Sequence, residues 1–181
     1  MKCYNRFFLG GSIMWGGIYA VLFSISTIMS SENPVKNGFP NVFTHPYEKI
    51  TSSMVEFQDR IIGSELQYSY YLNRKYGPLQ PGYSISVTDQ GGIWLGSGFI
   101  RKVNLNNVIN FNFDFFPGIY VKNSEEDLGG WLMFRSGIEL EYSINSYWKI
   151  SLGYDHRSSG DLWEYNPGME TIKFSISKIT K

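Results

Sequence analysis

Residues 134–155 read FRSGIELEYSINSYWKISLGYD and alternate apolar with polar side chains along two segments. The apolar parity carries large residues, namely Phe134, Ile138, Leu140, Tyr142 and Ile144, then Trp148, Ile150, Leu152 and Tyr154. The other parity carries glycine, serine and charged residues, namely Arg135, Gly137, Glu139, Glu141 and Ser143, then Lys149, Ser151, Gly153 and Asp155. Successive side chains of a strand point to opposite faces, so a period of two indicates β-structure. The segment predicts two strands, each with one apolar and one polar face.

The same period recurs along the chain from Glu65 onward. Further strands are expected at residues 65–72, 83–87, 93–103, 109–115 and 171–177, and a first strand is expected near Ser52 to Arg60. Together with the two segments above, these make eight strands. The sequence therefore predicts an all-β fold, an eight-stranded antiparallel β-barrel of the outer-membrane type.

The length, net charge and cysteine count of the chain exclude several classes of protein. A chain of 181 residues has the size of one domain, and its 16 basic and 16 acidic residues cancel. A nucleic-acid-binding protein usually shows a basic surface, so no nucleic-acid partner is expected. The single cysteine, Cys3, cannot form a disulfide framework or a thiolate metal site. We predict neither a metal nor a cofactor.

The N-terminus has the pattern of an export signal. Lys2 and Arg6 precede a charge-free apolar run from Phe7 to Met29, which predicts a signal peptide over residues 1–31 with cleavage between 26 and 32. An uncleaved anchor is the alternative, because about 20 apolar residues can span a bilayer. Residues 32–62, which contain three X-Pro breakers, are expected to form a lead-in with the first strand. Residues 63–181 are expected to form the barrel, with a catalytic C-terminal hairpin.

Alternation alone does not say which face lines the interior. A lipocalin-like soluble barrel turns its apolar face inward, whereas an outer-membrane barrel turns it toward lipid. The polar parity contains both signs of charge, which can pair inside a narrow lumen, and the apolar parity is rich in aromatic residues suited to the membrane interface. These features and the export segment favour the outer membrane. The C-terminal Ile179-Thr180-Lys181 departs from the aromatic end of many outer-membrane chains.

Three reactive residues interrupt the apolar faces of the last two strands. The parity of Trp148 to Tyr154 continues to His156 and Ser158, and counting back from Ile172 reaches Glu170. If His156 lies opposite Glu170, Ser158 faces Gly168, and Cβ atoms of opposed residues lie about 4.5 to 5.5 Å apart. A serine becomes a nucleophile when a histidine takes its proton and a carboxylate orients the imidazole. The sequence therefore predicts a catalytic triad of Ser158, His156 and Glu170.

The expected hairpin connection, Ser159 to Pro167, supplies the remaining parts of such a site. The backbone N–H groups of Ser159 and Gly160 are the predicted donors to an oxyanion. The alternative interpretation is an ordinary Ser- and Gly-rich hairpin loop beside an interfacial histidine. The other candidates are weaker: Asp155 has the wrong parity, Asp161 and Glu164 fall in the connection, and His45 beside Pro46 fits a loop residue.

The C-terminal third also resembles a known family. The segments Asp127-Leu128-Gly129-Gly130, Phe134 to Leu140, His156-Arg157-Ser158 and Asn166-Pro167-Gly168-Met169-Glu170 are similar to the PagL-type lipid A 3-O-deacylases. That resemblance implies an eight-stranded barrel, a His-Ser-Glu triad formed by His156, Ser158 and Glu170, and removal of the ester-linked 3-O acyl chain of lipid A. Ser159 departs from the family pattern, which usually has Asn there, and a side-chain hydrogen bond of that Asn is thereby weakened or lost.

Topology adds a separate argument. With an even number of strands and both chain ends in the periplasm, the last hairpin connection lies at the cell exterior, the leaflet that holds lipid A. Our working hypothesis is a serine-type lipid A esterase in the outer membrane of a Gram-negative cell envelope, with lipopolysaccharide as substrate. The rivals are a non-enzymatic OmpA/OmpX-like barrel and a periplasmic lipocalin-like lipid binder.

Overall fold

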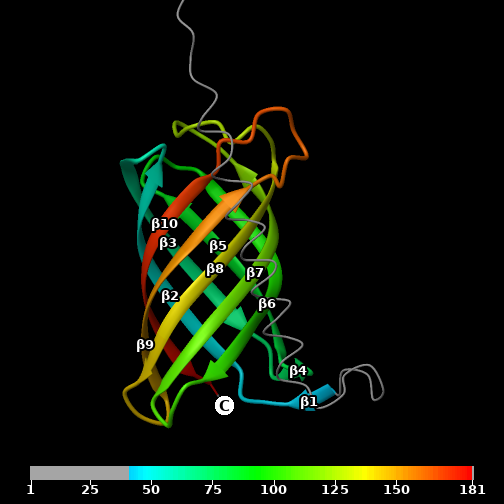
Figure 1. The fold of residues 1–181 in the computed structure, drawn as a ribbon, viewed down its shortest axis with the longest axis vertical. Coiled ribbons are helices and arrows are strands. Elements are labelled where there is room, and N and C mark those ends of the chain that lie inside the picture. The colour runs from blue at the N-terminus through cyan, green and yellow to red at the C-terminus, as the bar shows by residue number, and fades with distance from the viewer. Residues whose placement is uncertain (1–40, 181) are drawn as a thin grey trace, which may run out of the picture.

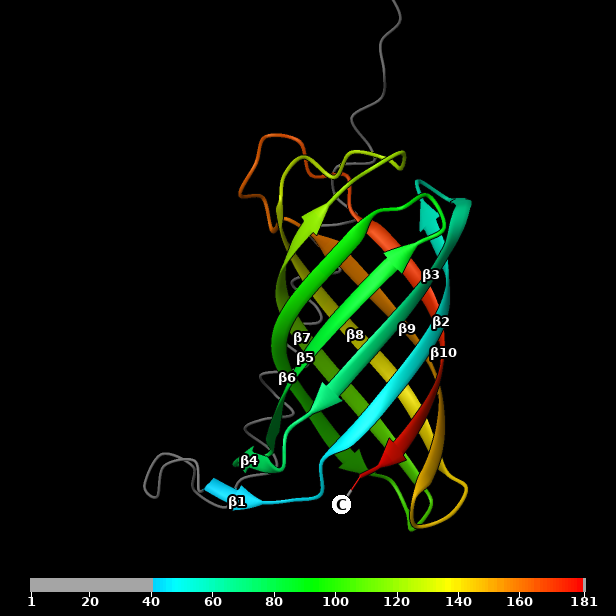
Figure 2. The same ribbon diagram turned by 180° about the vertical axis from the view of Figure 1, so that it is seen from behind.

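The structure, a computed structural model, describes residues 41–180, which form an all-β fold (Figures 1 and 2). The strands are β1 (Asn41–Phe43), β2 (Tyr47–Phe57), β3 (Arg60–Tyr71), β4 (Arg74–Tyr76), β5 (Leu79–Thr88), β6 (Ile93–Asn104), β7 (Ile109–Val121), β8 (Leu132–Ser143), β9 (Trp148–Ser158) and β10 (Met169–Ile179). All except β1 and β4 join an antiparallel ring, in which β5 pairs with β6 and β2 pairs with β10. The predicted eight-stranded barrel is confirmed.

The barrel has an apolar outside, and its inside combines polar and charged side chains with a cluster of buried aromatic and aliphatic ones that includes Trp94 and Tyr120. In β10 the outward side chains of Ile172 and Phe174 are 47% and 46% exposed, whereas the inward Thr171 and Lys173 are 0% and 3% exposed. A soluble barrel would bury the apolar set instead. The predicted orientation is therefore confirmed, and the lipocalin alternative is wrong. Within residues 41–180, no helix is long and apolar enough to cross a membrane.

Paired charges fill the lumen. Ion pairs in the lumen, measured between nitrogen and oxygen, include Lys49–Glu139 at 2.8 Å, Lys102–Glu141 at 3.1 Å, Lys149–Glu141 at 2.9 Å, Arg135–Glu65 at 2.9 Å and Arg135–Asp155 at 2.8 Å. A buried charge is costly unless an opposite charge and hydrogen bonds satisfy it. This requirement explains why both signs of charge occur on the polar parity of the strands.

The start of the barrel differs from the expectation. The first strand was expected near Ser52 to Arg60 and the barrel from residue 63, but β2 spans Tyr47–Phe57 and β3 already begins at Arg60. Between them Gln58 and Asp59 adopt positive φ angles of 49° and 62°, which make a tight turn. Ser52 takes an outward position, so the apolar alternation of β2 is interrupted there. The expected signal peptide over residues 1–31 lies outside the described residues.

The two ends of the barrel differ in their connections. The chain's C-terminal end lies at the end that carries β1 and β4, and the longer connections, 122–131 and 159–168, lie at the other (Figure 1). In outer-membrane barrels the long connections are extracellular. The two long loops also pack together, since the rings of Trp131 and Trp163 lie 6.4 Å apart between centroids. The hairpin β9–β10 thus carries its loop to the exterior end.

Candidate active site

The pairing of β9 with β10 brings His156 and Glu170 together. They are direct partners in the strand register, as the parity of the sequence predicts. His156 Nδ1 lies 3.0 Å from Glu170 Oε1. An ionised carboxylate only accepts hydrogen bonds, so the imidazole donates from Nδ1 and its Nε2 is left as an acceptor. This tautomer is the one that allows Nε2 to take a proton.

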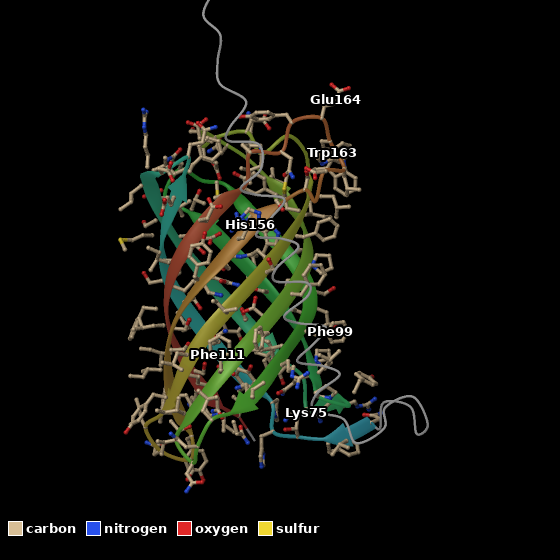
Figure 3. All side chains as sticks on the ribbon, in the orientation of Figure 1. Lys75, Phe99, Phe111, His156, Trp163 and Glu164 are labelled. Atoms are coloured by element: carbon tan, nitrogen blue, oxygen red, sulfur yellow. The ribbon has the colours of Figure 1, made fainter. Side chains whose placement is uncertain are left out.

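The side chain of His156 belongs to the outward face and is nevertheless only 3% exposed. Figure 3 labels it in the upper part of the barrel wall, below the loop that carries Trp163 and Glu164. Gly168 covers the ring, because a Cβ atom added to this glycine would lie 2.7 Å from His156 Cε1. Gly168 also has a φ of +74°, a conformation that favours glycine. The backbone therefore approaches the imidazole as closely as only a glycine allows.

Ser158 lies on the same outward face as His156, two residues further along β9. It is half-buried and pairs with Phe134 of β8. The ladder to β10 ends with Arg157 opposite Met169, one pair earlier than expected, so Gly168 does not face Ser158 in the strand register. The buried Nε2 atom of His156 has no hydrogen-bond partner among residues 41–180. A buried polar atom without a partner is rare, and here it lies on the side of the ring turned away from Glu170.

The loop after Ser158 is held by Asn166. Its side-chain Oδ1 accepts a hydrogen bond of 2.9 Å from the Ser159 N–H, and its Nδ2 donates to Asp161 at 2.8 Å. The Ser159 N–H, one of the two expected oxyanion donors, is therefore engaged elsewhere in this conformation. The N–H of Gly160, the second expected donor, makes no hydrogen bond to the described residues.

Three residues near the pair had no role assigned to them from the sequence. Asn166 and Gly168 belong to the motif that carries the family resemblance, but nothing in the local pattern indicates that one holds the Ser159 N–H and the other covers His156. Ser136 of β8 is the register partner of His156 and places a second hydroxyl beside it on the outward face. Parity together with the β8–β9 register could have identified Ser136.

The competing side chains lie apart from the pair. Asp155 points into the lumen, where Arg135 and Thr171 bind it. Glu164 is an exposed loop residue, and Asp161 is engaged by Asn166. The exposed His45 lies in the link between β1 and β2, at the opposite end of the barrel. Within the described range no group of three or more His, Cys, Asp or Glu side chains is arranged to hold a metal ion.

Comparison with solved structures shows the fold. A designed transmembrane β-barrel is 6% identical with a TM-score of 0.57, covering 77% of this chain and 98% of the design. Neisserial surface protein A is 6% identical with a TM-score of 0.55, covering 78% and 99%. The outer-membrane enzyme PagL is 13% identical with a TM-score of 0.50, covering 74% and 98%. No curated protein sequence matches the chain.

A comparison with protein families shows which family of proteins the chain is related to. The family described as "Lipid A 3-O-deacylase (PagL)" matches residues 50–178, a range that starts inside β2 and ends near the end of β10. The match covers nearly the whole barrel and includes the hairpin that joins His156 to Glu170. The barrel therefore lies in the outer membrane, and the chain belongs to the lipid A 3-O-deacylase (PagL) family.

Proposed function

We propose that this lipid A 3-O-deacylase is a serine-type hydrolase in which Ser158 attacks, His156 is the general base and Glu170 orients the imidazole. The observation that carries the proposal is the 3.0 Å contact between His156 Nδ1 and Glu170 Oε1 on the lipid-facing wall. A carboxylate at Nδ1 stabilises the imidazolium that forms when Nε2 takes a proton. The buried, unpartnered Nε2 is the atom that would accept it.

In the proposed reaction the acyl group is transferred twice, first from lipid A to Ser158 and then from Ser158 to water. Ser158 Oγ bonds to the ester carbonyl carbon while its proton passes to His156 Nε2. The bond between this carbon and the sugar 3-oxygen then breaks, and His156 returns the proton to that oxygen. A water molecule, deprotonated by His156 Nε2, then bonds to the carbonyl carbon of the acyl-serine. The bond from that carbon to Ser158 Oγ breaks, His156 returns the proton to Oγ, and a 3-hydroxy fatty acid leaves. The products are this acid and lipid A with a free 3-hydroxyl, and Ser158 is regenerated.

The tetrahedral intermediates need hydrogen-bond donors beside Ser158. We assign this role to the Gly160 N–H, which has no protein acceptor among residues 41–180. The Ser159 N–H joins it only if its 2.9 Å bond to Asn166 opens. Gly160 has a φ of +61° and lies beside Phe134, so its backbone turns next to the residue that pairs with Ser158.

The position in the membrane suits this substrate. His156 lies near the end of the barrel with the long loops (Figure 3). It belongs to the outward, apolar face of the wall, which meets lipid in an outer-membrane barrel. Beside Ser158, the ring of Phe134 stacks on Phe115 with a centroid distance of 5.9 Å. An acyl chain gains free energy from contact with such an apolar surface. An ester of lipid A can thus reach Ser158 without leaving the outer leaflet.

The product of the reaction tests the function directly. Full-length protein purified in detergent micelles is mixed with lipid A that carries an ester-linked chain at position 3, and mass spectrometry follows both products. We expect the loss of one 3-hydroxyacyl chain and the release of the matching acid. Lipid A already lacking that chain is the control substrate and should stay unchanged. A folded, heat-modifiable barrel that leaves both substrates intact would contradict the proposal and favour a non-enzymatic barrel.

Gly168 provides a second test, because its substitution acts on the imidazole. In Gly168→Ala the new Cβ would lie 2.7 Å from His156 Cε1, so the ring must move away from its position between Glu170 and the substrate. A misplacement of about 1 Å can cost about 100-fold in rate, so we expect kcat to fall by about 10- to 100-fold.

Gly77→Ala is the matched control for backbone strain. Gly77 also has a positive φ, +57°, but lies in the turn between β4 and β5, at the far end of the barrel. Both variants should lose about 1 kcal/mol of stability. Only Gly168→Ala should lose activity, as measured by acid release per heat-modifiable barrel. Equal activities of the two variants would show that Gly168 does not hold the imidazole in place.

A further inference from the structure

On its lumen side, β9, the strand that carries His156 and Ser158, contacts a group of buried charged side chains. Asp155 and Arg157 flank His156 in β9 and point inward, and each is 1% exposed. Arg157 also precedes Ser158 directly. Because side chains alternate along a strand, whatever holds these two inward residues also sets the backbone from which His156 and Ser158 project.

Four ionic side chains form a closed circuit across the lumen. Arg157 Nη2 lies 2.5 Å from Glu65 Oε1, and Arg135 Nη2 lies 2.9 Å from Glu65 Oε2. The same Arg135 nitrogen lies 2.8 Å from Asp155 Oδ2. These contacts therefore link Arg157 of β9 to Glu65 of β3, Glu65 to Arg135 of β8, and Arg135 back to Asp155 of β9. We call these four residues the lumen circuit.

The second strand of the hairpin is attached to the same circuit. Thr171, which follows Glu170 in β10, donates a hydrogen bond of 2.7 Å to Asp155 Oδ1. Thr171 is the register partner of Asp155, just as Glu170 is the register partner of His156. The inward pair thus lies directly beside the outward pair, and both strands that carry the catalytic side chains are anchored by one set of contacts.

The guanidinium of Arg157 is also confined by aromatic rings. Its central carbon lies 5.9 Å from the ring centroid of Trp94 and 5.5 Å from that of Tyr120. Contacts of a cation with aromatic rings are favourable and stronger away from water. Together with the bond to Glu65, they leave the Arg157 side chain, and hence the backbone between His156 and Ser158, little freedom.

We infer that Glu65 is a positioning residue for the deacylation reaction: through Arg157 and Arg135 it fixes the strand from which His156 and Ser158 reach the substrate. The inference rests on the proposed function. Glu65 lies on β3, inside the lumen, so it does not touch a substrate on the lipid side. Its loss should therefore slow the chemical step without weakening substrate binding.

Glu65→Gln tests this inference, and Glu141→Gln is its matched control. Glu141 is also a buried glutamate with two cationic partners, Lys102 and Lys149 at 3.1 and 2.9 Å, but it lies toward the opposite end of the barrel. Either substitution leaves two cations short of one negative charge, buried arginines in Glu65→Gln and part-buried lysines in Glu141→Gln, so both should lower barrel stability. We expect kcat per heat-modifiable barrel to fall about 10- to 100-fold in Glu65→Gln and less than about 2-fold in Glu141→Gln, with KM unchanged in both.

Equal kcat values for the two variants, or a rise in KM alone, would overturn the inference. If Glu65→Gln does not fold, Glu65→Asp decides instead, since it keeps the negative charge but is one methylene too short to hold Arg157 and Arg135 at the same time. In that variant a several-fold fall in kcat is expected, and wild-type kcat would overturn the inference. Wild-type protein is measured alongside: if it is inactive, the proposed function fails, whereas an active wild type with active Glu65→Gln refutes the positioning role alone.

Discussion

Replacing Ser158 with alanine lowers kcat/KM for lipid A deacylation by a factor of about 10⁴ or more. The expectation follows from the loss of the only covalent acceptor in the mechanism, which leaves binding and electrostatic stabilisation to support a slow attack by water. The substitution removes one oxygen atom at a half-buried position, so the barrel should remain folded. Acid release by purified protein in micelles measures the effect, and heat-modifiable migration reports the folded fraction.

Ser136→Ala is the control for that experiment. Ser136 pairs with His156 across β8 and β9 and presents a second hydroxyl to the imidazole from the same face. We expect Ser136→Ala to stay within about 3-fold of wild-type kcat/KM, since surface changes outside the machinery have small effects. A serine-reactive phosphonate should label wild type and Ser136→Ala but not Ser158→Ala. If activity and labelling depend on Ser136 instead, the assignment of the nucleophile is wrong.

Replacing Glu170 with glutamine lowers kcat by about 10² to 10⁴. The amide keeps the shape of the side chain but loses the charge that stabilises the imidazolium, and it can also select the wrong tautomer of His156. The 3.0 Å contact with Nδ1 is the interaction that is changed, and it lies outside the lumen circuit. Steady-state kinetics should show the loss in kcat with little change in KM, because the carboxylate acts on the transition state.

Glu56→Gln separates a specific role of Glu170 from a general effect of negative charge. Glu56 of β2 is the register partner of Glu170 on the side away from His156. Its substitution removes an equal charge from the neighbouring position without touching the imidazole contact. We expect Glu56→Gln to retain kcat within about 3-fold. Comparable losses in both variants would mean that the local field, and not the Glu170 hydrogen bond, supports the reaction.

Much of the site could be predicted from the alternation of side chains within single strands and from the pairing of neighbouring strands. Once residues 148–155 alternate, their parity assigns His156 and Ser158 to the outward face, and the parity of residues 171–177 does the same for Glu170. A hairpin between adjacent strands has few possible registers, because a slip of one residue turns every side chain to the other face. These two constraints place His156 opposite Glu170 without any knowledge of the rest of the barrel.

Other features could not be predicted from the sequence, because they depart from the alternation of apolar and polar side chains along a strand. In β2 a register shift between Val55 and Glu56 and the outward Ser52 weaken the alternation, so the start of the barrel was misplaced. In the loop after Ser158 no strand ladder sets the hydrogen bonds. The Ser159 N–H therefore bonds to Asn166, seven residues ahead, instead of remaining free for an oxyanion.

The amino-acid sequence alone determined the eight strands of the barrel, apart from where the first begins, and the pairing of His156 with Glu170, since both depend on alternation within a strand or between neighbours. The apolar outer face followed from the paired charges of the polar parity and from the export segment, not from the alternation. Only the tertiary structure decided that Gly168 covers the imidazole and that Glu65 reaches Arg157, 92 positions away. Contacts across a lumen depend on how many strands close the barrel and how far they are staggered. No local pattern encodes that closure, because it is a property of the whole ring of strands.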